Sequence, residues 1–237
     1  MSFGGMAFFK KYSLLVLLIW ILPASDIRAQ TIELSLRLTC GRQDLNLENE
    51  TYKLNQTDSF KLSVLKFYIS NLEFWNNDTL LLKEENSYHL IDASKPESLH
   101  LQVSSTKNFG YDELRFNLGV DSTTTVSGAM SGALDPINGM YWTWQSGYIH
   151  SKIEGMVFLN GTGKEFVYHL GGYQYPFNSL QEVRLKTSSS KSLGIQVDLF
   201  PFLSKLNFNK QTHLMSPCDD SVLYSKWVSD CFSINQK

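Results

Sequence analysis

The sequence lacks the marks of several common functional classes. Its Lys and Arg residues are scattered, without the basic stripe that nucleic-acid binding needs. No P-loop, nucleophile elbow or H-E-x-x-H motif occurs, and no acid–base or nucleophile set is assembled. The formal net charge of -2 indicates no particular partner. These absences argue against a nucleic-acid partner and make an enzyme the least favoured class.

Long hydrophobic runs are also missing, and the apolar stretch Leu14–Leu22 is too short to span a bilayer comfortably. Two lysines precede it and a small residue, Ala29, closes the segment after it, which is the order of a secretory signal peptide. We expect cleavage after Ala29, with Ala24 as the alternative. Residues 1–29 are then a signal peptide, and residues 30–237 form one domain exported to the periplasm or the extracellular space. No cysteine follows the apolar stretch closely, so we expect no stable membrane anchor.

Cysteine is scarce, and the three cysteines are Cys40, Cys218 and Cys231. Export would place them in an oxidising compartment, where one disulfide is expected. Cys218 and Cys231 are close in sequence and are the favoured pair. Cys40 is then buried, paired with another chain, or paired with Cys218 instead, because sequence does not decide the connectivity. A C-x-x-C zinc site is absent.

Alternation of apolar and polar residues, the period of a half-buried strand, marks most of the mature sequence. It is cleanest from Ile32 to Leu38, and further strand-like segments with turn signals between them lie at 60–64, 114–118, 166–170, 183–185 and 195–199. The apolar phase slips near Leu65 and Lys66, which predicts a bulge. Only the C-terminal segment, around Val222–Val228, has helical spacing. The sequence therefore predicts an all-β single domain, an antiparallel β-sandwich or barrel-like fold, with a short C-terminal helix.

One segment, from Asp121 to Met140, breaks the strand pattern. It is rich in Gly, Ser, Thr and Ala and has almost no bulky side chains. Loops of this length without regular structure are usually functional or disordered. This one leads directly into the densest aromatic cluster of the chain, Tyr141–Tyr148, which makes the cluster a candidate site.

The motifs around this cluster resemble the MbnP-like copper-binding family. They are GALDP-NGMYWTWQSGYI from Gly132 to Ile149, KIEG at Lys152–Gly155, YHLGGY at Tyr168–Tyr173, KFYISNLEF at Lys66–Phe74, YHLIDAS at Tyr88–Ser94 and LMSP at Leu214–Pro217. The resemblance implies an exported bacterial protein that binds copper through histidine. It also implies that a dihaem partner enzyme related to cytochrome c peroxidases oxidises one tryptophan to kynurenine, whose nitrogen then helps to hold copper.

The chemistry of that modification is physically reasonable. An intact indole offers only an N–H donor and cannot act as a ligand. Oxidative opening of the ring exposes an aromatic amine and a carbonyl, both with lone pairs. A site that combines this nitrogen with imidazole suits copper, and Cu(I) in particular.

Few residues can serve as the other ligands. His169 is the first candidate because it lies in the HLGG motif, and we expect Gly171 and Gly172 to leave space beside it. His89 is second, and His150 is third because it closely follows the tryptophans. The remaining residues considered are His100 and His213, expected on the surface, and Met130, Met140, Met156 and Met215, expected to fill the core.

The two tryptophans of the cluster, Trp142 and Trp144, should face opposite sides of a regular strand. At most one would then lie at a metal, and the other would lie in the core. The competing interpretation is a binding module without metal, in which Trp142, Trp144, Tyr148 and Tyr173 bind a glycan. A third is a structural or cell-surface interaction domain.

Overall fold

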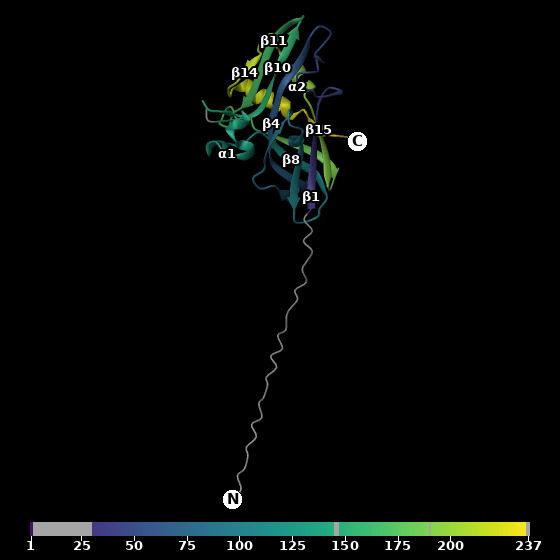
Figure 1. Cartoon of the computed structure of the whole chain (residues 1–237), viewed down its shortest axis with the longest axis vertical. Coiled ribbons are helices and arrows are strands. Elements are labelled where there is room, and N and C mark those ends of the chain that lie inside the picture. Colours follow the sequence, from purple (N-terminus) through teal and green to yellow (C-terminus); the bar gives the residue numbers. More distant parts are fainter. Residues whose placement is uncertain (2–29, 145–146, 190, 236–237) are drawn as a thin grey trace.

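Two β-sheets packed face to face build the protein, as the computed structural model shows (Figure 1). The structure describes residue 1 and residues 30–235, apart from 145–146 and 190. The predicted signal peptide therefore lies outside the described residues, except for Met1. None of the described helices is long and apolar enough to cross a bilayer.

The smaller sheet has the strand order β15-β13-β1-β2, with β7 also paired to β1. Its strands are β1 (Gln30–Cys40), β2 (Gln43–Asp44), β7 (His100–Ser105), β13 (Ser192–Asp198) and β15 (Phe232–Ile234). Burial along β1 alternates from Gln30 to Leu38, which confirms the strand expected from Ile32 to Leu38. The side chains at even positions face the core because successive residues of a strand point to opposite faces.

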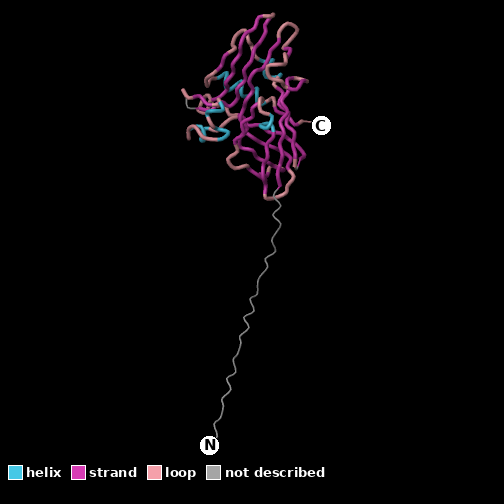
Figure 2. Tube along the Cα trace, in the orientation of Figure 1, coloured by secondary structure: helices cyan, strands magenta, loops and turns pink. Residues whose placement is uncertain are grey.

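The larger sheet has the order β12-β8-β4-β10-β11-β14, with β3, β5 and β6 also on β4 and β9 on β10. Its strands are β3 (Tyr52–Lys53), β4 (Ser59–Asn76), β5 (Thr79–Lys83), β6 (Tyr88–Asp92), β8 (Tyr111–Leu118), β9 (Tyr141–Trp142), β10 (Gly147–Leu159), β11 (Thr162–Gly171), β12 (Gln181–Ser189) and β14 (His213–Leu214). Strands dominate the whole trace (Figure 2). The expected β-sandwich is confirmed.

Both sheets are mixed, which corrects the expectation of purely antiparallel pairing. β1 runs parallel to β13, with Leu36 opposite Ile195, and β11 runs parallel to β14, with Tyr168 opposite Leu214. The other pairs are antiparallel within the described residues. A parallel pairing joins segments far apart in the chain, so local alternation does not reveal it.

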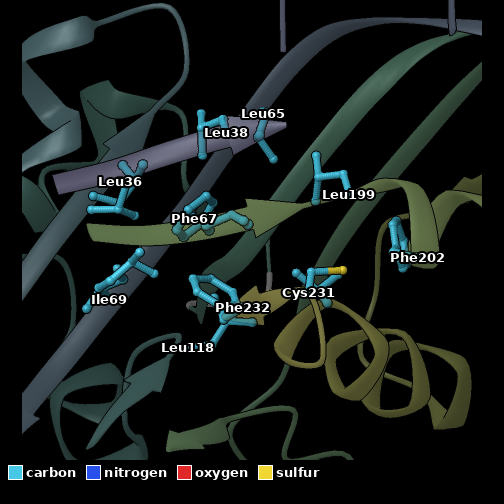
Figure 3. Close-up of a cluster of buried hydrophobic side chains, with 14 of the residues drawn as sticks. Leu36, Leu38, Leu65, Phe67, Ile69, Leu118, Leu199, Phe202, Cys231 and Phe232 are labelled. Atoms are coloured by element: carbon cyan, nitrogen blue, oxygen red, sulfur yellow. The ribbon is translucent and has the colours of Figure 1, made fainter. Parts of the chain in front are cut away.

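The main core lies between the two sheets. Figure 3 shows side chains of β1, β4 and the C-terminal segment pointing toward one another, and Phe232 packs edge-on against Phe67 at a ring-centroid distance of 5.6 Å. Phe116 meets the same ring at 5.4 Å. Burial of each such ring contributes about 1.5–3 kcal/mol. This core fixes the larger sheet as a rigid platform whose other face is free to carry a site.

β4 is the central strand of that platform and changes partner along its length. It pairs with β10 as far as Phe67 and with β8 from Ile69 onward. The register with β10 shifts at Ser63, which has no partner there, so the predicted bulge exists but lies two residues before Leu65. A second shift, against β8, falls at Asn71, whose φ is 54°.

The segment 121–140, expected without regular structure, contains short helical turns. They are α1 (Ser122–Val126) and the 3-10 helices η2 (Gly132–Leu134) and η3 (Pro136–Asn138). Asp121 caps α1 by accepting from the Thr124 amide at 2.9 Å, and Asp135 caps η3 in the same way at Ile137. Figure 1 shows α1 on the flank of the larger sheet, away from β1 and β15.

Three helices remain among the described residues. The 3-10 helix η1 (Pro96–Leu99) precedes β7, and the other two lie in the C-terminal part of the chain. α2 (Phe200–Lys205) was not expected, and α3 (Asp219–Ser229) is the predicted C-terminal helix. α3 separates Cys218 from Cys231 by its whole length. At a rise of about 1.5 Å per residue the two cysteines are roughly 16 Å or more apart, well beyond the about 7 Å limit for a disulfide. The predicted Cys218–Cys231 pair is therefore wrong, and all three cysteines are free.

Candidate metal centre

The outer face of β11 carries the first predicted ligand. Phe166, Tyr168 and Leu170 belong to the main core. Because side chains alternate along a strand, His169 and Gly171 point to the opposite face. The segment 121–142 covers part of this face and encloses a second apolar cluster, made of Tyr68, Val120, Leu134, Met140, Trp142, Tyr148 and Ile149.

His169 is held there by its neighbour on β10. Its Nε2 lies 2.6 Å from Oε1 of Glu154, and Lys152 stands directly opposite on the same strand. Burial lowers the pKa of His169, and this outweighs the opposing effect of Glu154. The pKa of Glu154 is itself lowered, because hydrogen bonding from His169 and the charge of Lys152 outweigh burial.

These pKa shifts indicate which nitrogen of the His169 ring carries the proton. An ionised Glu154 can only accept, so Nε2 of a neutral His169 carries the proton and donates. Nδ1 then bears a lone pair, and this atom is buried without a partner among the described residues. A carboxylate on one ring nitrogen and a free lone pair on the other is the arrangement of a metal-binding histidine.

Trp142 packs against Gly171, two residues along β11 from His169. A side chain on Gly171 would stand 2.9 Å from two indole carbons of Trp142, so only glycine leaves room for the ring. Gly171 is two residues from His169 on the same face, which places their Cα atoms about 7 Å apart. The space expected at Gly171 is thus filled by Trp142. The indole Nε1 is also buried and unpartnered within the described part of the chain.

Trp144 does not point away from Trp142 as expected. β9 ends at Trp142, so the alternation of a strand does not continue to Trp144. Trp142 is 5% exposed and Trp144 is 64% exposed, yet their ring centroids are 5.9 Å apart. The expectation of opposite faces is wrong, because a turn brings both rings to one side. Of the two, Trp142 is the buried ring.

Met215 follows the last residue of the strand beside β11. β14 runs parallel to β11 with Val167 opposite His213 and Tyr168 opposite Leu214, and it ends at Leu214, one residue before Met215. Met215 is 46% exposed, which corrects the expectation that it fills the core; only Met140, among the methionines considered, is fully buried. The one feature of the sequence that pointed to Met215 is its place in the LMSP motif.

A cavity of about 320 Å³ opens beside Trp142. It is lined by Tyr148, Gly172, Tyr173, Tyr175, Phe177 and Pro217, among others. Gly172 has a φ of 139°, and a side chain there would stand 2.1 Å from the Phe177 carbonyl oxygen. Gly171 therefore leaves room for the Trp142 ring, and Gly172 leaves room for the Phe177 backbone in the cavity wall.

Comparison with known proteins assigns the chain to a family. A family profile described as MbnP matches residues 29–218. The chain belongs to the MbnP family. The chain is also similar in structure to MbnP from Methylosinus trichosporium, with a TM-score of 0.54 and 14% sequence identity over 74% of this chain and 78% of that one. At that identity the likeness shows a shared fold. No curated protein sequence matches the chain.

His150 of this MbnP-family chain is occupied by structural contacts. It lies at the junction where β4 exchanges β10 for β8, and its Nδ1 is 3.1 Å from the Ser179 hydroxyl. Burial lowers its pKa to about 4, so the imidazole is neutral. A side chain on Gly119 would meet the ring at 2.5 Å. These contacts leave His150 locked in the interior.

His89 lies on the opposite face of the sheet from His169. Its strand neighbour Ile91 belongs to the main core, whereas Leu90 packs on the outer cluster. Its Nε2 is 2.7 Å from Glu84. The structure therefore does not bring His89 to Trp142. His100 and His213 are both exposed, as expected.

No cluster of three or more His, Cys, Asp or Glu side chains exists within the described residues. A metal on this surface would need other donors. Trp142 packs on Gly171, two residues from His169, and Met215 follows the strand beside β11. His169 and Trp142 each carry a buried nitrogen without a partner among the described residues.

Proposed function

We propose that this MbnP-family protein is an exported copper-binding protein, not an enzyme, and that its ligands are His169, Met215 and a nitrogen derived from Trp142. The observation that carries the proposal is a pair of buried nitrogens without a partner among the described residues, His169 Nδ1 and Trp142 Nε1. Their side chains belong to one region, because Trp142 packs on Gly171, two residues from His169. Burying a polar atom without a partner is costly, and a bound ion is one way in which a native fold satisfies such an atom.

The donor set favours Cu(I). Imidazole nitrogen and thioether sulfur are ligands of soft, low-valent copper, whereas the oxygen ligands that Ca²⁺ and Mg²⁺ require are not gathered here. Glu154 fixes the tautomer of His169 so that Nδ1 faces the site. Trp142 contributes only after oxidation to kynurenine, because its indole nitrogen has no available lone pair.

The site selects between the two tryptophans. Trp142 is buried against the strand that carries His169, and Trp144 is exposed. We therefore propose Trp142 as the residue that becomes kynurenine, with a dihaem enzyme as the oxidising partner. The nitrogen produced would occupy the position of the present Nε1.

The proposal is tested by Cu(I) competition titration of protein purified from its native host. His169→Ala should weaken binding by more than the about 10–100-fold that loss of an outer partner costs. Met215→Leu, which keeps the size of the side chain, should also weaken it. His100→Ala, at an exposed histidine of β7, is the matched control and should bind as the unchanged protein does. Unchanged affinity in His169→Ala would remove His169 from the site and overturn the proposal.

A further inference from the structure

Trp144 has no role in the ligand set, yet its position is unusual. A large apolar ring is held 64% exposed, and it contacts the buried Trp142 at a centroid distance of 5.9 Å with planes at 45°. Within the described residues this is the aromatic contact that Trp142 makes. Trp144 therefore connects a buried, oxidisable ring to the surface.

Trp142 itself is poorly placed to meet an oxidant. It is only 5% exposed, and the cavity beside it has about 320 Å³, too little for a haem protein or a bulky metal complex to enter. An oxidisable group between Trp142 and the surface would shorten the electron-transfer distance to such an oxidant. Trp144 is oxidisable, touches Trp142 and reaches solvent.

We infer that Trp144 is the electron relay through which a large, surface-docked one-electron oxidant oxidises Trp142. The inference rests on the proposed conversion of Trp142 and names the route of that conversion. Trp144 is a positioning residue in this sense, because it acts through Trp142 and is itself regenerated.

Conversion of Trp142 to kynurenine by this route removes four electrons from its indole. The oxidant removes one electron from Trp144, and the resulting radical cation regains an electron from Trp142. Four such transfers, with two water molecules adding their oxygens across the C2–C3 bond of the Trp142 indole, give N-formylkynurenine and release four protons to solvent. A haem enzyme supplied with two molecules of hydrogen peroxide takes up the four electrons and four protons and forms four molecules of water. Hydrolysis then releases formate and leaves kynurenine.

The exposed tyrosine at the same cavity provides a matched comparison. Tyr175 is 97% exposed and lines the cavity beside Trp142, and its ring is oxidisable. No ring contact between Tyr175 and Trp142 exists within the described residues, in contrast to Trp144. Ring contact, and not mere exposure near the site, is what the relay requires.

The test uses the recombinant mature chain and tris(bipyridine)ruthenium(III), generated by light with persulfate as the electron acceptor. Oxidised Trp142 is quantified by peptide mass spectrometry as a function of illumination. Trp144→Phe should lower the rate of Trp142 oxidation at least about tenfold. Trp144→Tyr differs from Trp144→Phe by one hydroxyl and has an oxidisable ring, so it should recover much of that rate. Tyr175→Phe should leave it unchanged.

The phenylalanine and tyrosine variants separate relay from shielding, since both cover Trp142 similarly but only tyrosine is readily oxidised. Equal rates in Trp144→Phe and the unchanged chain would overturn the relay, and so would equal loss in Trp144→Phe and Trp144→Tyr. The outcome is independent of copper. A failed relay with kynurenine present in native protein leaves the proposed function intact, and a working relay without native kynurenine refutes the function alone.

Discussion

Replacing His150 by Asn should remove most of the acid sensitivity that one buried imidazole gives this fold. Burial lowers the pKa of His150 from 6.5 to about 4, and backbone acceptors at Ser179 and Val120 and the charge of Asp121 offset only part of that effect. The unfolded chain takes up the proton near its ordinary pKa, whereas the folded chain does so only near pH 4. The neutral imidazole of His150 therefore leaves the fold at full stability above about pH 6.5, and the fold loses stability as the pH falls from there toward about 4.

The magnitude follows from the two pKa values. One pKa unit corresponds to about 1.4 kcal/mol, so lowering the pH from about 7.5 to about 4.5 costs roughly 2.5 kcal/mol through His150 alone. Carboxylates with lowered pKa values, such as Asp121 and Glu154, add a further loss in the same direction. A variant that keeps these carboxylates but lacks the imidazole isolates the contribution of His150.

Urea unfolding at the two pH values measures the effect. His150→Asn keeps a polar atom near the Ser179 hydroxyl but loses the packing of the buried ring, so its free energy of unfolding should be lower at neutral pH. Because the variant lacks the titrating imidazole, that free energy should fall by roughly 2.5 kcal/mol less on acidification than in the unchanged chain. His100→Asn, at an exposed position, should show the full loss. If His150→Asn loses as much stability as the unchanged chain, the buried, neutral imidazole is not the acid-sensitive group and the reasoning fails.

Two further changes probe the platform beneath the site. Gly171→Ala should destabilise the fold by about 1–3 kcal/mol and displace Trp142, because the new methyl would stand 2.9 Å from the indole. Thermal unfolding and tryptophan fluorescence measure the two effects. The control is Gly110→Ala, which should be nearly neutral because a methyl there would have nothing within 4 Å. Glu154→Gln should weaken copper binding about 10–100-fold in a competition titration, because it removes the charge that fixes the His169 tautomer. Equal affinity in that variant would mean that the carboxylate does not orient His169.

The strands of this fold could be predicted from the sequence because their period directly records burial. The alternation in β1 and in β11 predicted the correct core faces. α1 was missed because Ser122–Val126 is rich in Thr, a weak helix former, and depends on the Asp121 cap.

The contents of the site could be predicted only in part. His169 and the tryptophan pair were candidates from the sequence, but the choice of Trp142 depends on where β9 ends and on its contact with Gly171. Met215 becomes a candidate only through the parallel register of β14 on β11, a long-range pairing with no local signature. His89 was a candidate ligand because of its motif, and His150 because it closely follows the tryptophans. In the structure, His89 lies on the opposite face of the sheet from His169, and His150 is held in the interior by Ser179 and Gly119.

The most direct test of the account is the mass of the tryptic peptide 116–152 from protein purified from its native host. This peptide contains both Trp142 and Trp144, and fragmentation assigns a modification to one of them. The account predicts kynurenine at position 142 and an unmodified tryptophan at position 144. Two unmodified tryptophans, or kynurenine at position 144 alone, would contradict it.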